Sequence, residues 1–196
     1  MSTDRLEAFS DGVFAIAITL LVLLIRIPTP QQGRLIHSLA ELWPSYAAYV
    51  VSFFTIGIIW VNHHAQFRQI ERADRTLLFL NLLLLMWVSL LPFPTALVAD
   101  FLRAGGDRVT ATAVYSAVME VMSLSFFLLW RHATRAGLLT AKLSSAAVWR
   151  LTRRNMVGQF AYLVAFAAAF LSAPLSLLIC GAAALYYIYP GRQAAS

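Results

Sequence analysis

Charged residues and cysteines are both scarce in this chain of 196 residues. Asp, Glu, Lys and Arg together make up 12% of the sequence, about half their share in a typical soluble domain, whereas 60% of the residues are apolar. A soluble domain of this size could not cover so much hydrocarbon, because its large surface needs polar residues. The shortage of charge therefore excludes an ordinary soluble enzyme and a disordered tail, and it indicates an integral membrane protein.

Further absences narrow the function. The single cysteine, Cys180, lies in an apolar run, which excludes a disulfide within the chain and a cysteine-based metal site. The sequence has no nucleophile elbow, HExxH motif or glycine-rich phosphate loop, so we expect neither enzyme activity nor a bound cofactor. The net charge of +6 does not indicate nucleic-acid binding, because the basic residues lie between apolar blocks rather than on one face.

Apolar runs define the predicted architecture. A helix needs about 20 mostly apolar residues to cross roughly 30 Å of hydrocarbon. We predict six spans, at about 8–25, 42–61, 77–99, 109–130, 156–171 and 175–189. Pro174 marks the break between the last two, because proline ends a helix. The predicted fold class is therefore all-α, with one six-helix transmembrane domain over residues 1–196. The first span is not read as a cleaved signal peptide, because Asp11 lies at its start.

The distribution of Lys and Arg predicts the orientation. These residues concentrate in short loops on the cytoplasmic side of a membrane. If the N-terminus is cytoplasmic, eleven of the fifteen Lys and Arg lie on the inner side. The four on the outer side are Arg26, Arg34, Arg103 and Arg108. We therefore expect a multi-pass protein of the plasma membrane with both termini in the cytoplasm.

Polar residues within the spans are costly, so they are informative. Asp11 lies near the start of the first span, where an acid is also favoured by the helix dipole. The second span ends in Trp60, Asn62, His63 and His64, which we interpret as a hydrogen-bonding cluster at the same interface. A metal site is the alternative, but adjacent histidines on a helix point about 100° apart and no further ligand has suitable spacing. No metal is therefore predicted.

Glu120 lies in the middle of the fourth span. Thr112, Ser116 and Ser123 lie on the same helix face, so this stripe faces other helices or a wet cavity. One interpretation is a structural acid whose partner is Asn155 or Gln159. The other is a proton-coupled secondary transporter that uses Glu120 with His63 and His64.

The start of the chain resembles a known family. Arg5, Phe9, Ser10 and Asp11 form the RxxxFSD pattern that opens the first helix of the lysosomal potassium channel family, transmembrane protein 175, which has bacterial single-repeat homologues. Three further blocks resemble the family: WVNHH at 60–64, NLLLL at 81–85 and LPFPT at 91–95. The resemblance covers the first three spans, and the last three match only in hydropathy and number.

The resemblance implies a potassium-selective or weakly selective cation channel. Bacterial members with one repeat form homotetramers, in which four first helices line the pore and apolar side chains form its narrowest part. By offset from the FSD string, the constriction residues are Ile16, Leu20 and Leu23, with Thr19 as a polar layer nearby. The TVGYG filter is absent, so backbone carbonyls of that type do not replace the hydration shell of potassium. The implied partners are other copies of the chain, membrane lipid and the permeant ion.

The family also implies a polar network that ties the inner end of the pore helix to the second and third spans. Its members here are Arg5, Phe9, Ser10, Asp11, Trp60, Asn62 and His63. Such a network explains buried polar groups, because each of them needs a hydrogen-bond partner. The constriction stripe fits one helix face, since residues 16, 20 and 23 are spaced i, i+4 and i+7. In a wholly apolar helix such a stripe exists by default.

Overall fold

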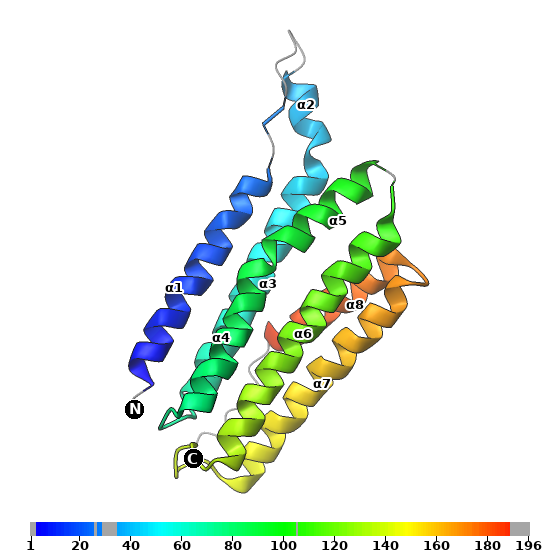
Figure 1. Cartoon of the computed structure of the whole chain (residues 1–196). Helices are drawn as coiled ribbons and strands as arrows, with labels where there is room; N and C mark the ends of the chain where they lie inside the picture. The colour runs from blue at the N-terminus through cyan, green and yellow to red at the C-terminus, as the bar shows by residue number, and fades with distance from the viewer. Residues whose placement is uncertain (1–2, 26, 29–34, 105, 189–196) are drawn as a thin grey trace.

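The computed structural model describes residues 3–25, 27–28, 35–104 and 106–188 (Figure 1). In chain order its helices are α1 (Asp4–Leu20), the 3-10 helix η1 (Leu21–Leu24), α2 (Leu35–Glu41), α3 (Trp43–Phe67), α4 (Arg75–Leu90), α5 (Pro92–Ala104), α6 (Arg108–Arg135), α7 (Ser145–Ala169) and α8 (Ala173–Ile188). One isolated bridge pairs Ile70 with Leu139, and the described residues contain no β-strand. The prediction of an all-α fold is confirmed.

The long helices run roughly alongside one another and form a bundle (Figure 1). α1 lies at one side against α3 and α4, whereas α6 lies between α4 and α5 on one side and α7 and α8 on the other. We call the end drawn at the bottom of Figure 1 the lower end. There α1 and α4 begin, α3 and α6 end, and residues 136–144 connect α6 to α7.

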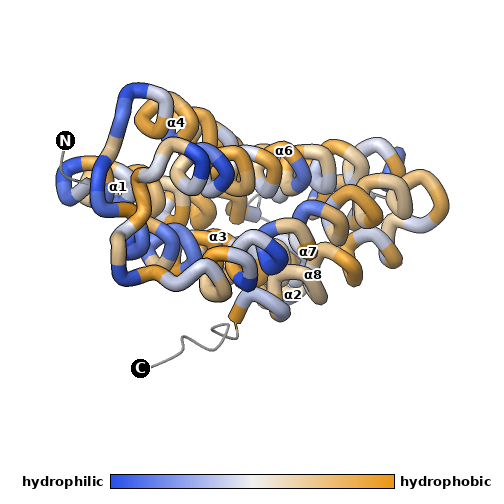
Figure 2. Tube along the Cα trace, turned by 90° about the horizontal axis from the view of Figure 1, so that it is seen from below, coloured by the Kyte–Doolittle hydropathy of each residue, from blue (hydrophilic) through white to orange (hydrophobic). Residues whose placement is uncertain are grey.

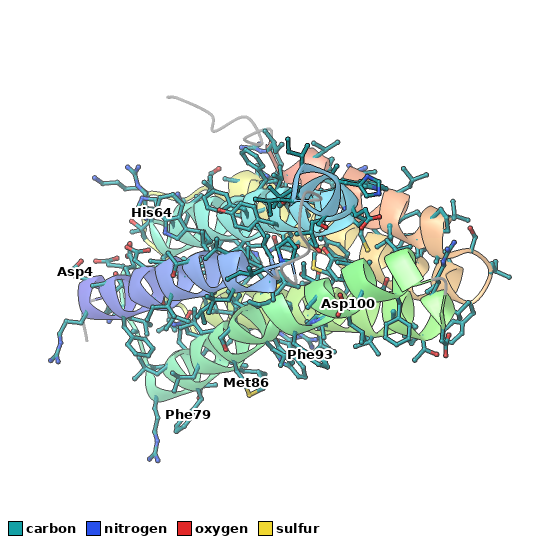
Figure 3. All side chains as sticks on the ribbon, turned by 90° about the horizontal axis from the view of Figure 1, so that it is seen from above. Asp4, His64, Phe79, Met86, Phe93 and Asp100 are labelled. Atoms are coloured by element: carbon teal, nitrogen blue, oxygen red, sulfur yellow. The ribbon has the colours of Figure 1, made fainter. Side chains whose placement is uncertain are left out.

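The surface of the bundle is apolar between its ends. Hydrophilic residues gather toward the lower end, and the middles of the helices are hydrophobic (Figure 2). Phe79, Met86 and Phe93 point away from the bundle and are more than half exposed (Figure 3). Within the part of the chain that the structure describes, four stretches are long and apolar enough to cross a membrane, namely Asp4–Leu24, Trp43–Phe67, Arg75–Leu102 and Arg108–Arg135. An exposed apolar belt of this kind is what lipid requires of a multi-pass protein.

The helices extend beyond the predicted spans. α3 continues to Phe67, and α7 begins at Ser145, eleven residues before the predicted fifth span. Hydropathy detects where a helix enters lipid, whereas the helix itself continues through polar residues that hydropathy ignores. The short α2 was not predicted. Tyr189 in the sixth predicted span, and Arg26, Arg34 and Arg192 in the count of charges, lie outside the described residues.

The predicted third span is two helices rather than one. The break is at Leu91, because Pro92 and Pro94 lie in the first turn of α5 and cannot supply the amide donors that a continuous helix needs. The Thr95 hydroxyl donates to the Leu91 carbonyl at 2.9 Å. The Ser52 hydroxyl of α3 lies 2.9 Å from the Thr95 hydroxyl. The kink is therefore tied to a neighbouring helix.

The sequence analysis predicted that Pro174 marks the break between α7 and α8, but the break lies before it. α7 ends at Ala169, and Pro174 is the second residue of α8. Proline suits the first turn of a helix, because its missing N–H would have no partner there in any case. The turn is stabilised by Ser176, whose hydroxyl donates to the Ala165 carbonyl at 2.7 Å.

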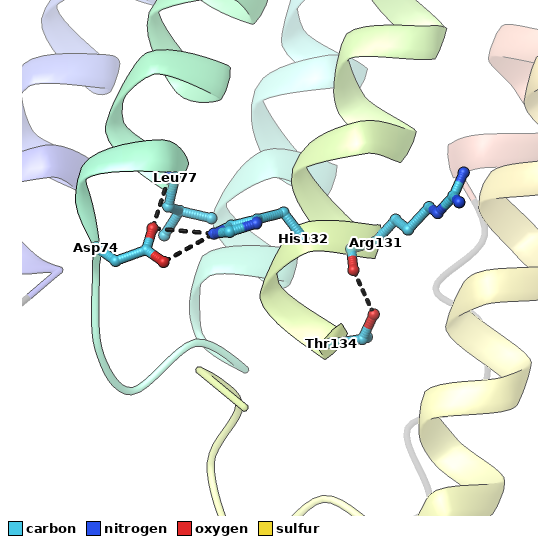
Figure 4. A network of polar contacts seen from close by, with 5 residues as sticks. All are labelled: Asp74, Leu77, Arg131, His132 and Thr134. Carbon is cyan, nitrogen blue, oxygen red and sulfur yellow. Dashed lines mark hydrogen bonds and ion pairs between the residues drawn. The ribbon is translucent and has the colours of Figure 1, made fainter. Parts of the chain in front are cut away.

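At the lower end, Asp74 joins two helices (Figure 4). Its carboxylate caps α4 by accepting from the Leu77 amide at 2.8 Å, and it accepts from His132 Nε2 of α6 at 2.8 Å. The Leu77 amide, and after it the His132 contact, hold the pKa of Asp74 below its ordinary value. Asp107 caps α6 within its own helix, because it accepts from the Thr110 amide at 2.9 Å and from the Thr110 hydroxyl at 2.6 Å.

We predict that Asp74→Ala destabilises the bundle more than Asp107→Ala does. Loss of the cap costs about 1 kcal/mol, and loss of the part-exposed contact with His132 costs up to about 1 kcal/mol more. Thermal unfolding of the two variants in detergent tests this. Equal midpoints for the two variants would show that the contact with His132 contributes nothing.

The destabilisation caused by Asp74→Ala should become smaller as the pH falls into the acid range. Because the pKa of Asp74 is lowered by folding, its contribution is complete above the ordinary value of about 3.9 and is lost as the pH falls through the lower folded value. The difference in midpoint between the wild type and Asp74→Ala should therefore be constant near neutral pH and shrink in acid.

Candidate functional site

α1 has one buried face and one exposed face. The buried face consists of residues at helical spacing, namely Leu6, Ser10, Phe14, Ala17 and Leu21. On the exposed face, Ile16 is 61% exposed, Leu20 42% and Leu23 73%. Thr19 is also exposed, and its hydroxyl donates to the Ile16 carbonyl at 2.9 Å. An apolar stripe thus faces away from the rest of the chain.

The end of α1 keeps this stripe in line although the helix type changes. Leu21–Leu24 is a 3-10 helix, in which side chains three residues apart eclipse each other. Leu23 therefore lies above Leu20, which itself lies one α-helical turn above Ile16. The sequence analysis assumed a continuous α-helix, and the same alignment results from an α-helix followed by a 3-10 turn.

A chain of buried hydrogen bonds holds the other face of α1. His63 of α3 and Asn81 of α4 pair at 2.9 Å, and the Asn81 amide donates to the Ser10 hydroxyl of α1 at 2.9 Å. Ser10 in turn donates to the Leu6 carbonyl at 2.7 Å. These three polar side chains are at most 1% exposed. We call this chain the Ser10–Asn81–His63 relay.

The direction of the relay follows from counting protons. Ser10 gives its only proton to Leu6, so it can only accept from Asn81. The Asn81 oxygen is then left to accept, and His63 must carry a proton on Nε2. Phe14 and Phe67 surround the imidazole, with ring centroids at 5.3 and 4.3 Å. The three hydrogen bonds of the relay therefore lie in an apolar environment.

A second contact between α1 and α3 lies at the surface. Trp60 Nε1 donates to Asp11 Oδ1 at 2.7 Å, and the Trp60 ring stacks on His64. His64 Nδ1 also lies 3.7 Å from a Glu7 carboxylate oxygen. The Asp11 carboxylate is therefore fixed by a hydrogen bond to α3 of the same chain.

Asn62 belongs to a different cluster from the other predicted network residues. Arg154 of α7 donates to Asn62 Oδ1 at 2.9 Å and to the Tyr187 carbonyl of α8 at 3.0 Å. The Tyr187 hydroxyl donates to the Arg154 carbonyl, and its ring lies over the guanidinium. Gly158 leaves room for this ring, because a Cβ there would overlap the Tyr187 hydroxyl. The cluster joins α3, α7 and α8.

The structure does not bring the remaining predicted residues into the relay. Arg5 and Phe9 are exposed on the side of α1 that faces away from the chain. The sequence analysis gave no role to Asn81, Arg154 or Tyr187. Asn81 could have been singled out, because it is the only amide in an otherwise apolar span. Arg154 and Tyr187 gave no such signal, since their partners are far away in the sequence.

Glu120 and the two histidines form no common site. Gln159 of α7 donates to a carboxylate oxygen of Glu120, whereas His63 and His64 contact residues of α1, α3 and α4. One Glu120 oxygen and the Gln159 oxygen are buried without a protein partner. Among the residues that the structure describes, no three His, Cys, Asp or Glu residues are grouped so that they could hold a metal ion.

Comparisons with known proteins agree on one family. The family model described as endosomal/lysosomal potassium channel TMEM175 matches residues 5–92. A potassium channel of Streptomyces collinus is 51% identical over 99% of this chain and 98% of its own length. The chicken protein described as endosomal/lysosomal proton channel TMEM175 is 36% identical over 68% of this chain, which corresponds to 28% of that longer protein.

A solved structure gives the same result. The crystal structure of a lysosomal potassium-selective channel TMEM175 homolog from Chamaesiphon minutus superimposes with a TM-score of 0.85. The two chains are 42% identical, and the match covers 95% of this chain and 96% of the other.

We predict that Asn81→Leu destabilises the protein by about 1–3 kcal/mol. The substitution leaves the His63 N–H and a Ser10 lone pair buried without partners, which costs a full desolvation penalty. Thermal unfolding in detergent measures the effect. The matched control on α4 is Ser89→Ala, since Ser89 is exposed and bonds only the Met86 carbonyl of its own helix. If both variants melt with the wild type, the relay does not stabilise the bundle.

Proposed function

Because the chain belongs to the TMEM175 family of endosomal/lysosomal potassium channels, we propose that it is a potassium-selective or weakly selective cation leak channel with a pore lined by α1. The family consists of membrane-spanning ion channels and not of enzymes. The observation in this chain that carries the proposal is the exposed apolar stripe of α1, formed by Ile16, Leu20 and Leu23. The fixed polar contacts on the opposite side of the helix support it.

The proposed channel is a homotetramer of one domain, residues 1–196, with six spans per chain. α7 and α8 would complete the six. α8 is a short apolar helix of 16 residues, and the exposed face of α7 is apolar from Met156 onward. The turn at 170–172 is too short to hold a folded connection, so the two helices form a hairpin through the same membrane.

In this proposal four copies of α1 surround the ion path. Ile16, Leu20 and Leu23 form successive apolar rings, and Thr19 adds a polar layer. A pore of this kind conducts when it is wide enough to stay wetted and closes by dewetting when it narrows. The Ser10–Asn81–His63 relay and the Asp11–Trp60 contact would set the position and rotation of α1, and so the width of the rings.

Charge at the lower end supports a cation path. Asp4 and Glu7 lie in the first turn of α1 and Asp11 lies one turn further on, and Arg5 offsets only one of these charges. Glu7 and Asp11 also contact His64 and Trp60 of α3. A ring of acids at a pore mouth raises the local concentration of cations. By the distribution of Lys and Arg, we place the lower end and both termini in the cytoplasm and the channel in the plasma membrane.

No observation favours the transporter reading over the channel. It requires Glu120, His63 and His64 to act on one path, but Gln159 contacts Glu120 while Asn81 contacts His63. In the channel reading, these contacts are structural bonds between neighbouring helices.

We predict that Ile16→Asn and Leu23→Asn change the unitary conductance or the potassium-to-sodium permeability ratio of the purified channel in planar bilayers. An amide in an apolar ring attracts water and removes the dewetting barrier, so a larger conductance is the expected direction.

The matched control is Leu178→Asn on α8, a leucine that is 70% exposed and thus comparable to Leu23. Its current should equal that of the wild type. If all three variants conduct with wild-type conductance and selectivity, α1 does not line the pore.

A further inference from the structure

The charge of the chain is unevenly divided. The last acidic residue is Glu120, and residues 121–196 hold seven Lys and Arg with no Asp or Glu. Six of the seven are described, and they are Arg131, Arg135, Lys142, Arg150, Arg153 and Arg154. All six lie in the part of the lower end formed by α6, α7 and their connection. Around α1 and the α3–α4 connection, by contrast, the cations are mixed with acids, as at Glu71 next to Arg72.

Two of these cations form an exposed pair with an aromatic residue on α7. Arg150 and Arg153 are exposed, and the Arg153 guanidinium lies 5.5 Å from the centre of the Trp149 ring. Trp149 is itself 61% exposed. Arg154, the next residue, turns inward to Asn62 and Tyr187 and is not available to a ligand.

The same face of α7 becomes apolar directly above this pair. Met156, Phe160 and Leu163 follow Arg153 at helical spacing and are 56%, 69% and 50% exposed. The face thus changes from cations and an indole to hydrocarbon within one helical turn. Trp and Arg side chains take this position at the level of lipid headgroups, where one end is wet and the other apolar.

We propose that Trp149, Arg150 and Arg153 form a binding site for the headgroup of an anionic phospholipid, whose acyl chain lies along Met156, Phe160 and Leu163. A guanidinium binds a phosphate through paired hydrogen bonds, and no carboxylate on α7 or α8 competes for it within the described residues. The apolar stripe distinguishes a phospholipid from a free phosphate, since only the lipid covers both parts. The site is separate from the ion path along α1.

The test is thermal unfolding of the purified full chain in neutral detergent, titrated with phosphatidylglycerol. Phosphatidylglycerol should raise the midpoint, whereas phosphatidylcholine and glycerol phosphate should not. In Arg150→Gln/Arg153→Gln, the lipid concentration needed for the same shift should rise roughly 30-fold, from about 1 kcal/mol for each cation at an anionic surface. Arg150→Lys/Arg153→Lys should lose less of the response than the glutamine pair, because it keeps the charge but not the paired hydrogen bonds of the guanidinium.

The matched control is Arg68→Gln/Arg72→Gln, which removes two exposed cations from the lower end beside Glu71. This control should respond to phosphatidylglycerol like the wild type. If it loses the response as much as Arg150→Gln/Arg153→Gln does, the effect is general surface charge and the site does not exist. A shift of the same size with phosphatidylcholine or glycerol phosphate would also overturn the proposal. Neither outcome depends on whether the channel conducts potassium.

Discussion

The Ser10–Asn81–His63 relay is the interaction on which the proposed function depends. It joins α1, α3 and α4 through side chains that are almost fully buried, and each donor and acceptor in it has one possible role. Apolar contacts alone specify the rotation of a helix less strictly, because rotating an apolar face leaves no hydrogen-bonding group without a partner. One buried polar face removes this freedom, since rotation would leave several hydrogen-bonding groups without partners. The relay therefore decides which apolar residues of α1 face outward.

The lower end combines two electrostatic sectors. Acids lie on the first turns of α1, where the proposed pore begins, and an acid-free group of cations lies on α6 and α7. In the proposed channel the first sector would attract permeant cations, and the second would attract anionic lipid headgroups. The net charge of the whole chain is +6, and this single number does not show that acids and cations are separated into two sectors.

The sequence predicts the all-α fold and the family well, because both depend on local patterns. Apolar runs identify the helices, and the pattern from Arg5 to Asp11 identifies the family. Contacts between helices are not local, so they could not be predicted. Asn62, for example, pairs with Arg154, which is 92 residues away, instead of joining the relay. Pro92 and Pro94 indicate the kink at Leu91, but the sequence analysis relied on hydropathy, and the apolar run continues through both prolines. The spacing of apolar residues in α1 could not predict which face points outward, because apolar residues occur all around it. The structure identifies the inward face by the burial of Leu6, Ser10 and Phe14.

The most direct test of the central claim is a current–voltage record of the purified full chain in a planar bilayer, with potassium on one side and sodium on the other. A leak channel with a pore lined by α1 predicts a steady current that survives Glu120→Gln, and a reversal potential displaced toward the potassium equilibrium potential. The absence of a current, or a flux that is lost in Glu120→Gln, would contradict the account.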